Sequence, residues 1–135
     1  MAKGSNQKLK MLYLVKIFTE ETDEDHGLTM KEIIDRLAAC GVSADRKTLY
    51  QDFEELALFG FDIVSDRIGR DTLYSLASRE FELPELKLLV DAVQGSRFIT
   101  EKKSNELIGK LERLASRHQA RYLQRQVVTG GRIMT

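Results

Sequence analysis

Apolar residues recur with helical spacing in the first part of the chain and predict two helices before residue 40. The first spans about residues 7–20 and carries apolar side chains on two faces, Leu9 belonging to the second of them. The second begins after Thr29, which forms a capping box with Glu32. The apolar positions of the second helix form one stripe, made of Met30, Ile33, Ile34, Leu37 and Ala38.

A third helix follows a short turn around Gly41. Asp45 is the expected N-cap, with Ser43 as a competing cap, and Gly60 ends the helix. The residues expected on its inner face are Leu49, Phe53, Leu56 and Ala57.

The period of the apolar positions then changes from 3.6 to about 2. Residues 63–65 and 72–76 are short β-prone runs on either side of the sequence RIGR at 67–70. The pattern predicts a β-hairpin.

Helical spacing returns after the hairpin. Pro84 suits the first turn of a fourth helix that stops near Gly95, and Thr100 caps a fifth that extends to about Gln119. The segment 126–135 resembles another hairpin, one without a sheet to join.

These elements predict a mainly α fold, a winged helix-turn-helix of three helices and a β-hairpin wing, followed by a two-helix extension. The expected divisions are a winged helix-turn-helix domain at 1–76, a helical dimerisation or linker segment at 77–125, and a tail at 126–135. The tail is the expected start of a further C-terminal domain.

Composition adds a constraint on where a basic surface lies. The 135 residues are 42% hydrophobic and 31% charged, and the net charge is zero. Residues 1–76 carry 10 Lys and Arg against 14 Asp and Glu, whereas residues 77–135 carry 11 against 7. A nucleic-acid footprint on the first domain must therefore be a local patch.

Cys40 is the sole cysteine, and the N-terminus lacks the pattern of a secretory leader. No run approaches the ~18 apolar residues that span a bilayer. We expect a reduced, cytoplasmic protein without a membrane partner.

The sequence offers no arrangement of residues for catalysis, so we expect no enzyme, no cofactor and no metal. Cys40, His26 and His118 lack zinc spacing. The acidic loop after the first helix approaches the spacing of a calcium loop, but Glu21 and His26 stand where Asp and Gly are typical.

The outer face of the third helix is the principal candidate for function. Lys47 and Gln51 lie at its centre, and Arg46, Thr48 and Tyr50 flank them near the helix N-terminus. Lys donates to guanine and Gln pairs with adenine, so this face suits the major groove of duplex DNA. The alternative is an ordinary solvated helix face.

The hairpin tip adds two further cations. Arg67 and Arg70 stand around Gly69, where a wing meets the DNA backbone or minor groove. Thr29 and Lys31, at the start of the second helix, complete the set of candidate DNA-binding residues. The alternative for the tip is an ordinary basic turn.

Five segments resemble the DNA-binding region of DeoR-type transcriptional regulators, especially those that carry a WYL effector domain. Three belong to the winged helix-turn-helix: LTMKEII at 28–34, DRKTLYQDF at 45–53 and FGFDI at 59–63. Two belong to the helical segment that follows it: SREFELPELK at 78–87 and SRFIT at 96–100. The similarity extends from about residue 8 to residue 126.

This resemblance implies sequence-specific binding of double-stranded DNA by a homodimer in a bacterial regulator. The chain has no Trp, so the Trp-Tyr-Leu signature of the WYL domain is absent, and no effector is indicated. The chain is either part of a longer regulator or a natural short form.

Residues 77–125 are expected to pair two chains, because the fourth helix carries Leu88 and Ala92 outside its apolar stripe. The alternative function is a winged-helix adaptor that binds a protein through the third helix. The acidic balance of the first 76 residues and an exposed Leu58 favour that alternative.

Overall fold

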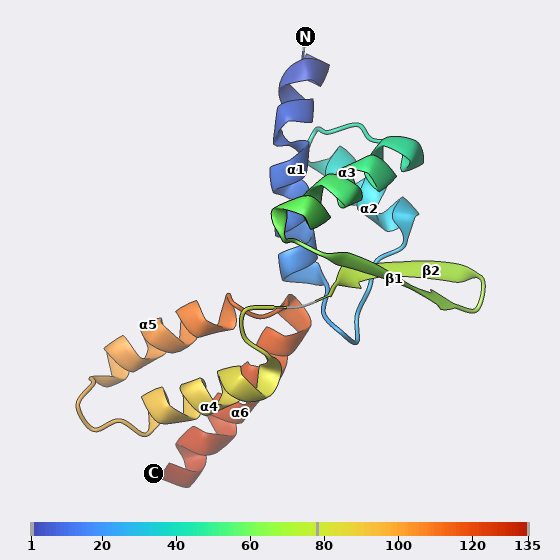
Figure 1. The fold of residues 1–135 in the computed structure, drawn as a ribbon. Coiled ribbons are helices and arrows are strands. Elements are labelled where there is room, and N and C mark those ends of the chain that lie inside the picture. The colour runs from blue at the N-terminus through green and yellow to red at the C-terminus, as the bar shows by residue number, and fades with distance from the viewer. Residues whose placement is uncertain (1, 78, 135) are drawn as a thin grey trace. The chain divides into compact units, whose positions relative to one another are not determined.

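The computed structural model is mainly helical, and its described residues include one two-stranded antiparallel hairpin (Figure 1). It describes the backbone of residues 2–77 and 79–134 and the side chains of residues 7–77 and 79–125. The elements in chain order are α1 (Ala2–Glu21), α2 (Met30–Ala39), α3 (Arg46–Phe59), β1 (Ile63–Ile68), β2 (Asp71–Leu76), α4 (Leu83–Gln94), α5 (Glu101–Glu112) and α6 (Arg117–Met134).

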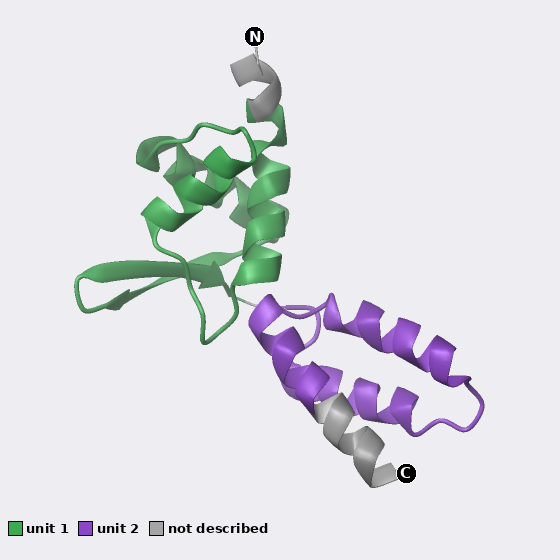
Figure 2. Cartoon of the chain, turned by 180° about the vertical axis from the view of Figure 1, so that it is seen from behind, with its two compact units in different colours: residues 1–78 green, residues 79–135 purple. Residues whose placement is uncertain are grey.

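The chain divides into two compact units, residues 1–78 and residues 79–135 (Figure 2). This division lies two residues beyond the boundary expected at residue 76. Unit 1 holds α1 to α3 and the hairpin, and unit 2 holds α4 to α6. Each unit has a hydrophobic core of its own.

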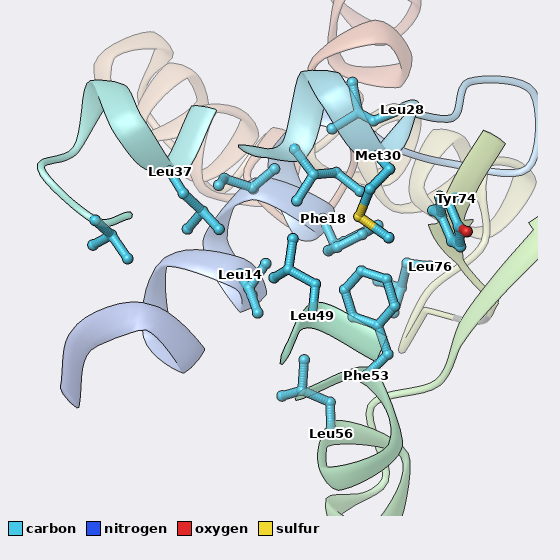
Figure 3. Close-up of a cluster of buried hydrophobic side chains, with 13 residues drawn as sticks. Leu14, Phe18, Leu28, Met30, Leu37, Leu49, Phe53, Leu56, Tyr74 and Leu76 are labelled. Carbon is cyan, nitrogen blue, oxygen red and sulfur yellow. The ribbon is translucent and has the colours of Figure 1, made fainter. Parts of the chain in front are cut away.

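The core of unit 1 is formed by all three helices and the hairpin (Figure 3). Phe53 of α3 contacts two other elements in this core: its ring meets Phe18 of α1 edge-on at a centroid distance of 5.7 Å and Tyr74 of β2 at 5.5 Å. Aromatic pairs at such distances add about 0.5 to 1.5 kcal/mol beyond the area that they bury. Helix α3 is therefore packed against α1 through Phe18 and against β2 through Tyr74.

The predicted caps of α2 and α3 are confirmed. Thr29 Oγ1 accepts the N–H of Glu32 at 3.2 Å, and Glu32 Oε1 accepts the N–H of Thr29 at 2.9 Å. Asp45, and not Ser43, caps α3, because its Oδ1 accepts the N–H of Thr48 at 2.9 Å. Gly60 ends α3 with a φ of 109°.

The predicted buried faces of the helices were too wide. Ala38 and Ala57 are exposed and Ile34 is half-buried. Helix α1 starts earlier than expected, and Leu9 on its predicted second buried face is 42% exposed. Ala38, Ala57 and Leu9 lie beyond the strip of each helix that meets the core, whereas the half-buried Ile34 packs against the core.

The hairpin strands are longer than the sequence predicted, and they pair from Ile63 with Leu76 to Ile68 with Asp71. The turn between them therefore has two residues, Gly69 and Arg70. Gly69 has a φ of 64°, which suits the first position of a type II′ turn. This turn joins the two strands at the tip of the hairpin (Figure 1).

Strand β2 is attached to the segment that leads into α2. The Leu28 N–H donates to Tyr74 O at 2.9 Å, and the Tyr74 N–H donates to Leu28 O at 2.7 Å. Gly27 passes so close to β2 that an added Cβ would lie 2.9 Å from the Cβ of Leu73. The buried Thr22 hydroxyl adds a second attachment, accepting the N–H of Leu76 at 3.1 Å.

Helix α1 also holds α3 and its preceding turn. Lys10 Nζ lies 2.8 Å from Asp52 Oδ2, and both side chains are largely buried. Gln7 Nε2 donates to Ser43 O at 2.7 Å. A buried ion pair of this kind is costly to break, because the remaining charge is left without a partner.

Unit 2 contains three helices, so the predicted two-helix extension was wrong. The expected fifth helix breaks after Glu112, and α6 begins at Arg117. Ser116 causes the new start, because its Oγ accepts the N–H of Gln119 at 3.0 Å. The core of unit 2 consists of Leu86, Val90, Ile108, Ala115 and Leu123.

The hairpin expected in the segment 126–135 is also wrong, because α6 runs through to Met134. The side chains of this segment lie outside the described residues. None of the described helices is long and apolar enough to cross a bilayer.

We expect Gly27→Ala to lower the free energy of unfolding of unit 1 by about 1 to 3 kcal/mol, because the added methyl meets β2 and the segment must shift. Urea unfolding measures the change. Gly109→Ala in α5 is the matched control, since nothing lies within 4 Å of an added Cβ there. The control should be neutral or stabilising by about 0.5 to 1 kcal/mol. An unchanged stability of Gly27→Ala would contradict the close approach to β2.

Candidate nucleic-acid interface

A hollow of about 390 Å³ lies where the N-terminal ends of α2 and α3 meet the hairpin. It brings together six of the nine residues that the sequence predicted for DNA binding, although they come from three separate elements. The lining residues are Thr29, Met30, Lys31, Arg46, Tyr50, Arg67, Arg70, Asp71, Thr72 and Tyr74.

The hollow is strongly cationic. Four of its side chains, Lys31, Arg46, Arg67 and Arg70, carry positive charge, and Asp71 alone carries negative charge. All four cations are exposed, and within the described residues none of them forms an ion pair. Their charge is therefore available to an anion from outside the chain.

Other cations of unit 1 differ from these four. Lys10 is paired with Asp52 at 2.8 Å, and Arg36 Nε is paired with Glu21 Oε1 at 2.9 Å. The Glu21 carboxylate raises the pKa of Arg36, so that guanidinium stays charged and bound. Asp52 and Glu21 thus neutralise cations outside the hollow, whereas the four cations of the hollow keep their charge.

Two helix N-termini add to the positive potential. Met30 and Lys31 open α2, and Arg46 opens α3, all three on the wall of the hollow. The first N–H groups of a helix have no partner within the helix, and the helix dipole is positive at that end. Such ends bind phosphate readily.

Two tyrosines meet at the hollow wall. Tyr74 OH lies 3.5 Å from Tyr50 OH, a long hydrogen bond. Burial, and secondarily the Tyr50 hydroxyl, raises the pKa of Tyr74 to about 12. The Tyr74 hydroxyl therefore keeps its proton to a higher pH than an ordinary tyrosine and adds no negative charge beside the cations.

Lys47 and Gln51 do not line the hollow and form a separate surface. Both are exposed on α3, on the side opposite the buried Leu49 and Phe53. Arg46 and Tyr50 precede them by one residue each, and one residue turns a helix by 100°. One side of helix α3, with Arg46 and Tyr50, therefore lines the hollow, and the adjacent side, with Lys47 and Gln51, forms an exposed polar face.

Thr48 lies in the helix cap. Its N–H donates to Asp45 Oδ1 at 2.9 Å, and its hydroxyl is 3.1 Å from both Asp45 O and Asp45 Oδ1. The bond from the Thr48 N–H lowers the pKa of Asp45. The structure therefore gives Thr48 a place in starting α3, and its contact with DNA stays a prediction.

Sequence reasoning missed four lining residues: Met30, Asp71, Thr72 and Tyr74. Thr72 and Tyr74 lie two residues apart in β2, so they share one face of the strand. The sequence does not show that this face meets the N-terminal ends of α2 and α3. Met30 stands between the predicted Thr29 and Lys31, and its own side chain is largely buried.

The acidic loop with calcium-like spacing is organised by its own hydrogen bonds. Asp23 Oδ1 accepts the N–H of Asp25 at 2.8 Å and lies 2.8 Å from His26 Nδ1. The backbones of Asp23 and His26 are bonded to each other as well. Among the residues that the structure describes, no group of three or more His, Cys, Asp or Glu side chains has the arrangement of a metal site.

Comparisons of the chain with known protein families, with curated proteins and with solved structures give no match. The hollow and the polar face of α3 therefore carry the functional inference.

We expect the free energy of unfolding to fall as the pH rises from about 10 to about 12, because folding raises the pKa of Tyr74 above its ordinary value of 10.0. Below pH 10 the folded and unfolded states both hold the proton. Between the two pKa values only the folded state holds it, so each step upward in pH favours unfolding. Urea unfolding across this range, compared with Tyr74→Phe, isolates the contribution. The same fall in the Tyr74→Phe protein would show that Tyr74 is not its source.

Proposed function

We propose that this chain is a double-stranded DNA-binding module of a transcriptional regulator. A backbone phosphate occupies the hollow, and the polar face of α3 contacts bases in the major groove. The observation that carries the proposal is the convergence of four exposed, unpaired cations and two helix N-termini on one hollow. Phosphates are the anions that such a constellation binds best.

The dimensions of α3 support major-groove binding. Its 14 residues make a rod about 21 Å long and about 10 to 12 Å across, which fits a major groove about 12 Å wide. Lys47 and Gln51 lie in its first half, where donors to guanine and adenine edges are needed. Glu54 and Glu55 lie further along, where they would repel phosphates.

Three helices followed by a hairpin with basic residues at the tip are the layout of a winged helix-turn-helix. In this interpretation α3 is the recognition helix, and Arg67 and Arg70 belong to the wing. The similarity of segments 28–34 and 45–53 to DeoR-type regulators supports the same interpretation. A cytoplasmic homodimer, with unit 2 contributing to the pairing, completes the proposal.

A protein-binding adaptor is the second candidate function. It is favoured by Leu58 and Phe59 near the end of α3, which are 90% and 86% exposed. The adaptor does not account for the cationic hollow, so the DNA-binding proposal explains more of the surface.

We expect the full chain to bind duplex DNA with an affinity that falls linearly on a log–log plot against salt, with a slope of about 0.9 per phosphate neutralised. Arg67→Gln and Arg70→Gln should each reduce that slope by about 1 and weaken all sequences alike. Lys16→Gln on the exposed side of α1 is the control and should leave the slope unchanged. Fluorescence anisotropy with random and selected duplexes measures these values. Failure to bind at low salt would favour the adaptor.

Replacement of the α3 face should alter base preference. Gln51→Ala should cost about 1 to 3 kcal/mol on a site selected from random duplexes and leave binding to random DNA nearly unchanged, because its amide reads a base edge. Gln124→Ala in unit 2 is a control of the same chemistry. If Gln51→Ala weakens random and selected sites equally, the polar face does not read sequence.

A further inference from the structure

The C-terminal end of α3 carries an apolar and acidic surface that DNA binding does not use. We call it the α3 end patch, and all its members are exposed: Glu54, Glu55, Leu58, Phe59 and Asp62. Leu58 and Phe59 are 90% and 86% exposed and adjacent in sequence, and contiguous exposed apolar surface rimmed by polar residues is a feature of interaction sites.

Neither the fold nor the DNA accounts for this patch. Phe53 and Leu56 already provide the inward side of this half of α3. Glu54 starts seven residues after Lys47, about 10 Å further along the helix axis, and its carboxylate would be repelled by a phosphate backbone. The patch is therefore an exposed surface whose chemistry suits a protein better than a nucleic acid.

Unit 2 carries a surface of complementary charge at the turn between α5 and α6. Residues 97–125 contain eight Lys and Arg against three Asp and Glu. Leu114, in the turn, supplies an apolar side chain that is 41% exposed. The basic corner, as we call it, consists of the exposed residues Lys110, Arg113, Leu114, Arg117 and Arg121.

We propose that the α3 end patch of one copy binds the basic corner of a second copy, and that the reverse contact closes a two-fold dimer. Opposite charges favour this pairing, whereas two basic corners set against each other would repel. Each chain carries both surfaces, so two identical contacts leave neither surface open to further chains. The dimer rests on the homodimer of the proposed function and names its interface. It needs no DNA, so the test below can fail while DNA binding is retained, and DNA binding can fail while the dimer is retained.

The test is a charge exchange in the full chain, followed by sedimentation equilibrium without DNA. One variant carries Glu54→Lys and Glu55→Lys, and the other carries Lys110→Glu and Arg113→Glu. Each alone sets like charges against each other at both contacts, and its dimer should be at least about tenfold weaker than that of the unmodified protein. A mixture of the two variants should form a heterodimer, because both contacts regain opposite charges.

The outcomes separate this interface from others. Dimerisation of the mixture but of neither variant alone establishes it, and also shows that both variants are folded. If the Glu54→Lys, Glu55→Lys protein still dimerises while Leu88→Asp in α4 does not, the interface is on α4 and the proposal is wrong. If the mixture of the two variants stays monomeric and only a chain that carries all four changes sediments like the unmodified protein, the contact lies within one chain and the proposal is wrong. An unmodified protein that stays monomeric at tens of micromolar also overturns the proposal.

Discussion

The arrangement of unit 1 depends on the pair of backbone hydrogen bonds between Leu28 and Tyr74. They attach β2 to the residue that precedes the α2 cap, so the hairpin tip is held beside the N-termini of α2 and α3. The Tyr74 side chain continues the connection: its ring packs on Phe53 of α3 and its hydroxyl reaches Tyr50. Gly27 allows the close approach. Without this attachment Arg67 and Arg70 would belong to an unsupported two-stranded ribbon, which is marginally stable in water.

The neutral net charge of the chain conceals a separation of charge. Acidic residues of unit 1 serve local purposes: Asp52 neutralises a buried lysine, Asp45 caps α3 and Glu32 completes the capping box of α2. Three further acidic residues, Glu54, Glu55 and Asp62, lie in and after the second half of α3, whereas Asp71 is the one acidic residue that lines the hollow. A local potential, and not the total charge, therefore decides which ligand unit 1 attracts.

Structural features that depend on residues close together in sequence could be predicted. Features whose position depends on residues far apart in sequence could not. The caps at Thr29 and Asp45 involve side chains three residues from the amides that they bind, so pattern alone suffices. The same logic was available at Ser116 and Gln119, but the apolar spacing continues through Leu114 and Ala115 and hides the break. Tyr74 at the hollow could not be predicted, because its position requires the hairpin register and a bond to Leu28, 46 residues earlier.

The division of α3 into two sides has a consequence for sequence recognition. Arg46 and Lys47 are adjacent in sequence, yet their side chains diverge by 100° around the helix, one into the hollow and the other onto the exposed face. A phosphate held in the hollow would therefore set the rotation of α3 about its own axis, and with it the base edge that Gln51 can reach. Because the hairpin supplies half of the cations in the hollow, the wing of the proposed regulator would add affinity for any sequence, and the polar face of α3 would select the bases. The orientation of α3 on the duplex would then depend on how firmly Leu28 and Tyr74 hold the hairpin beside it.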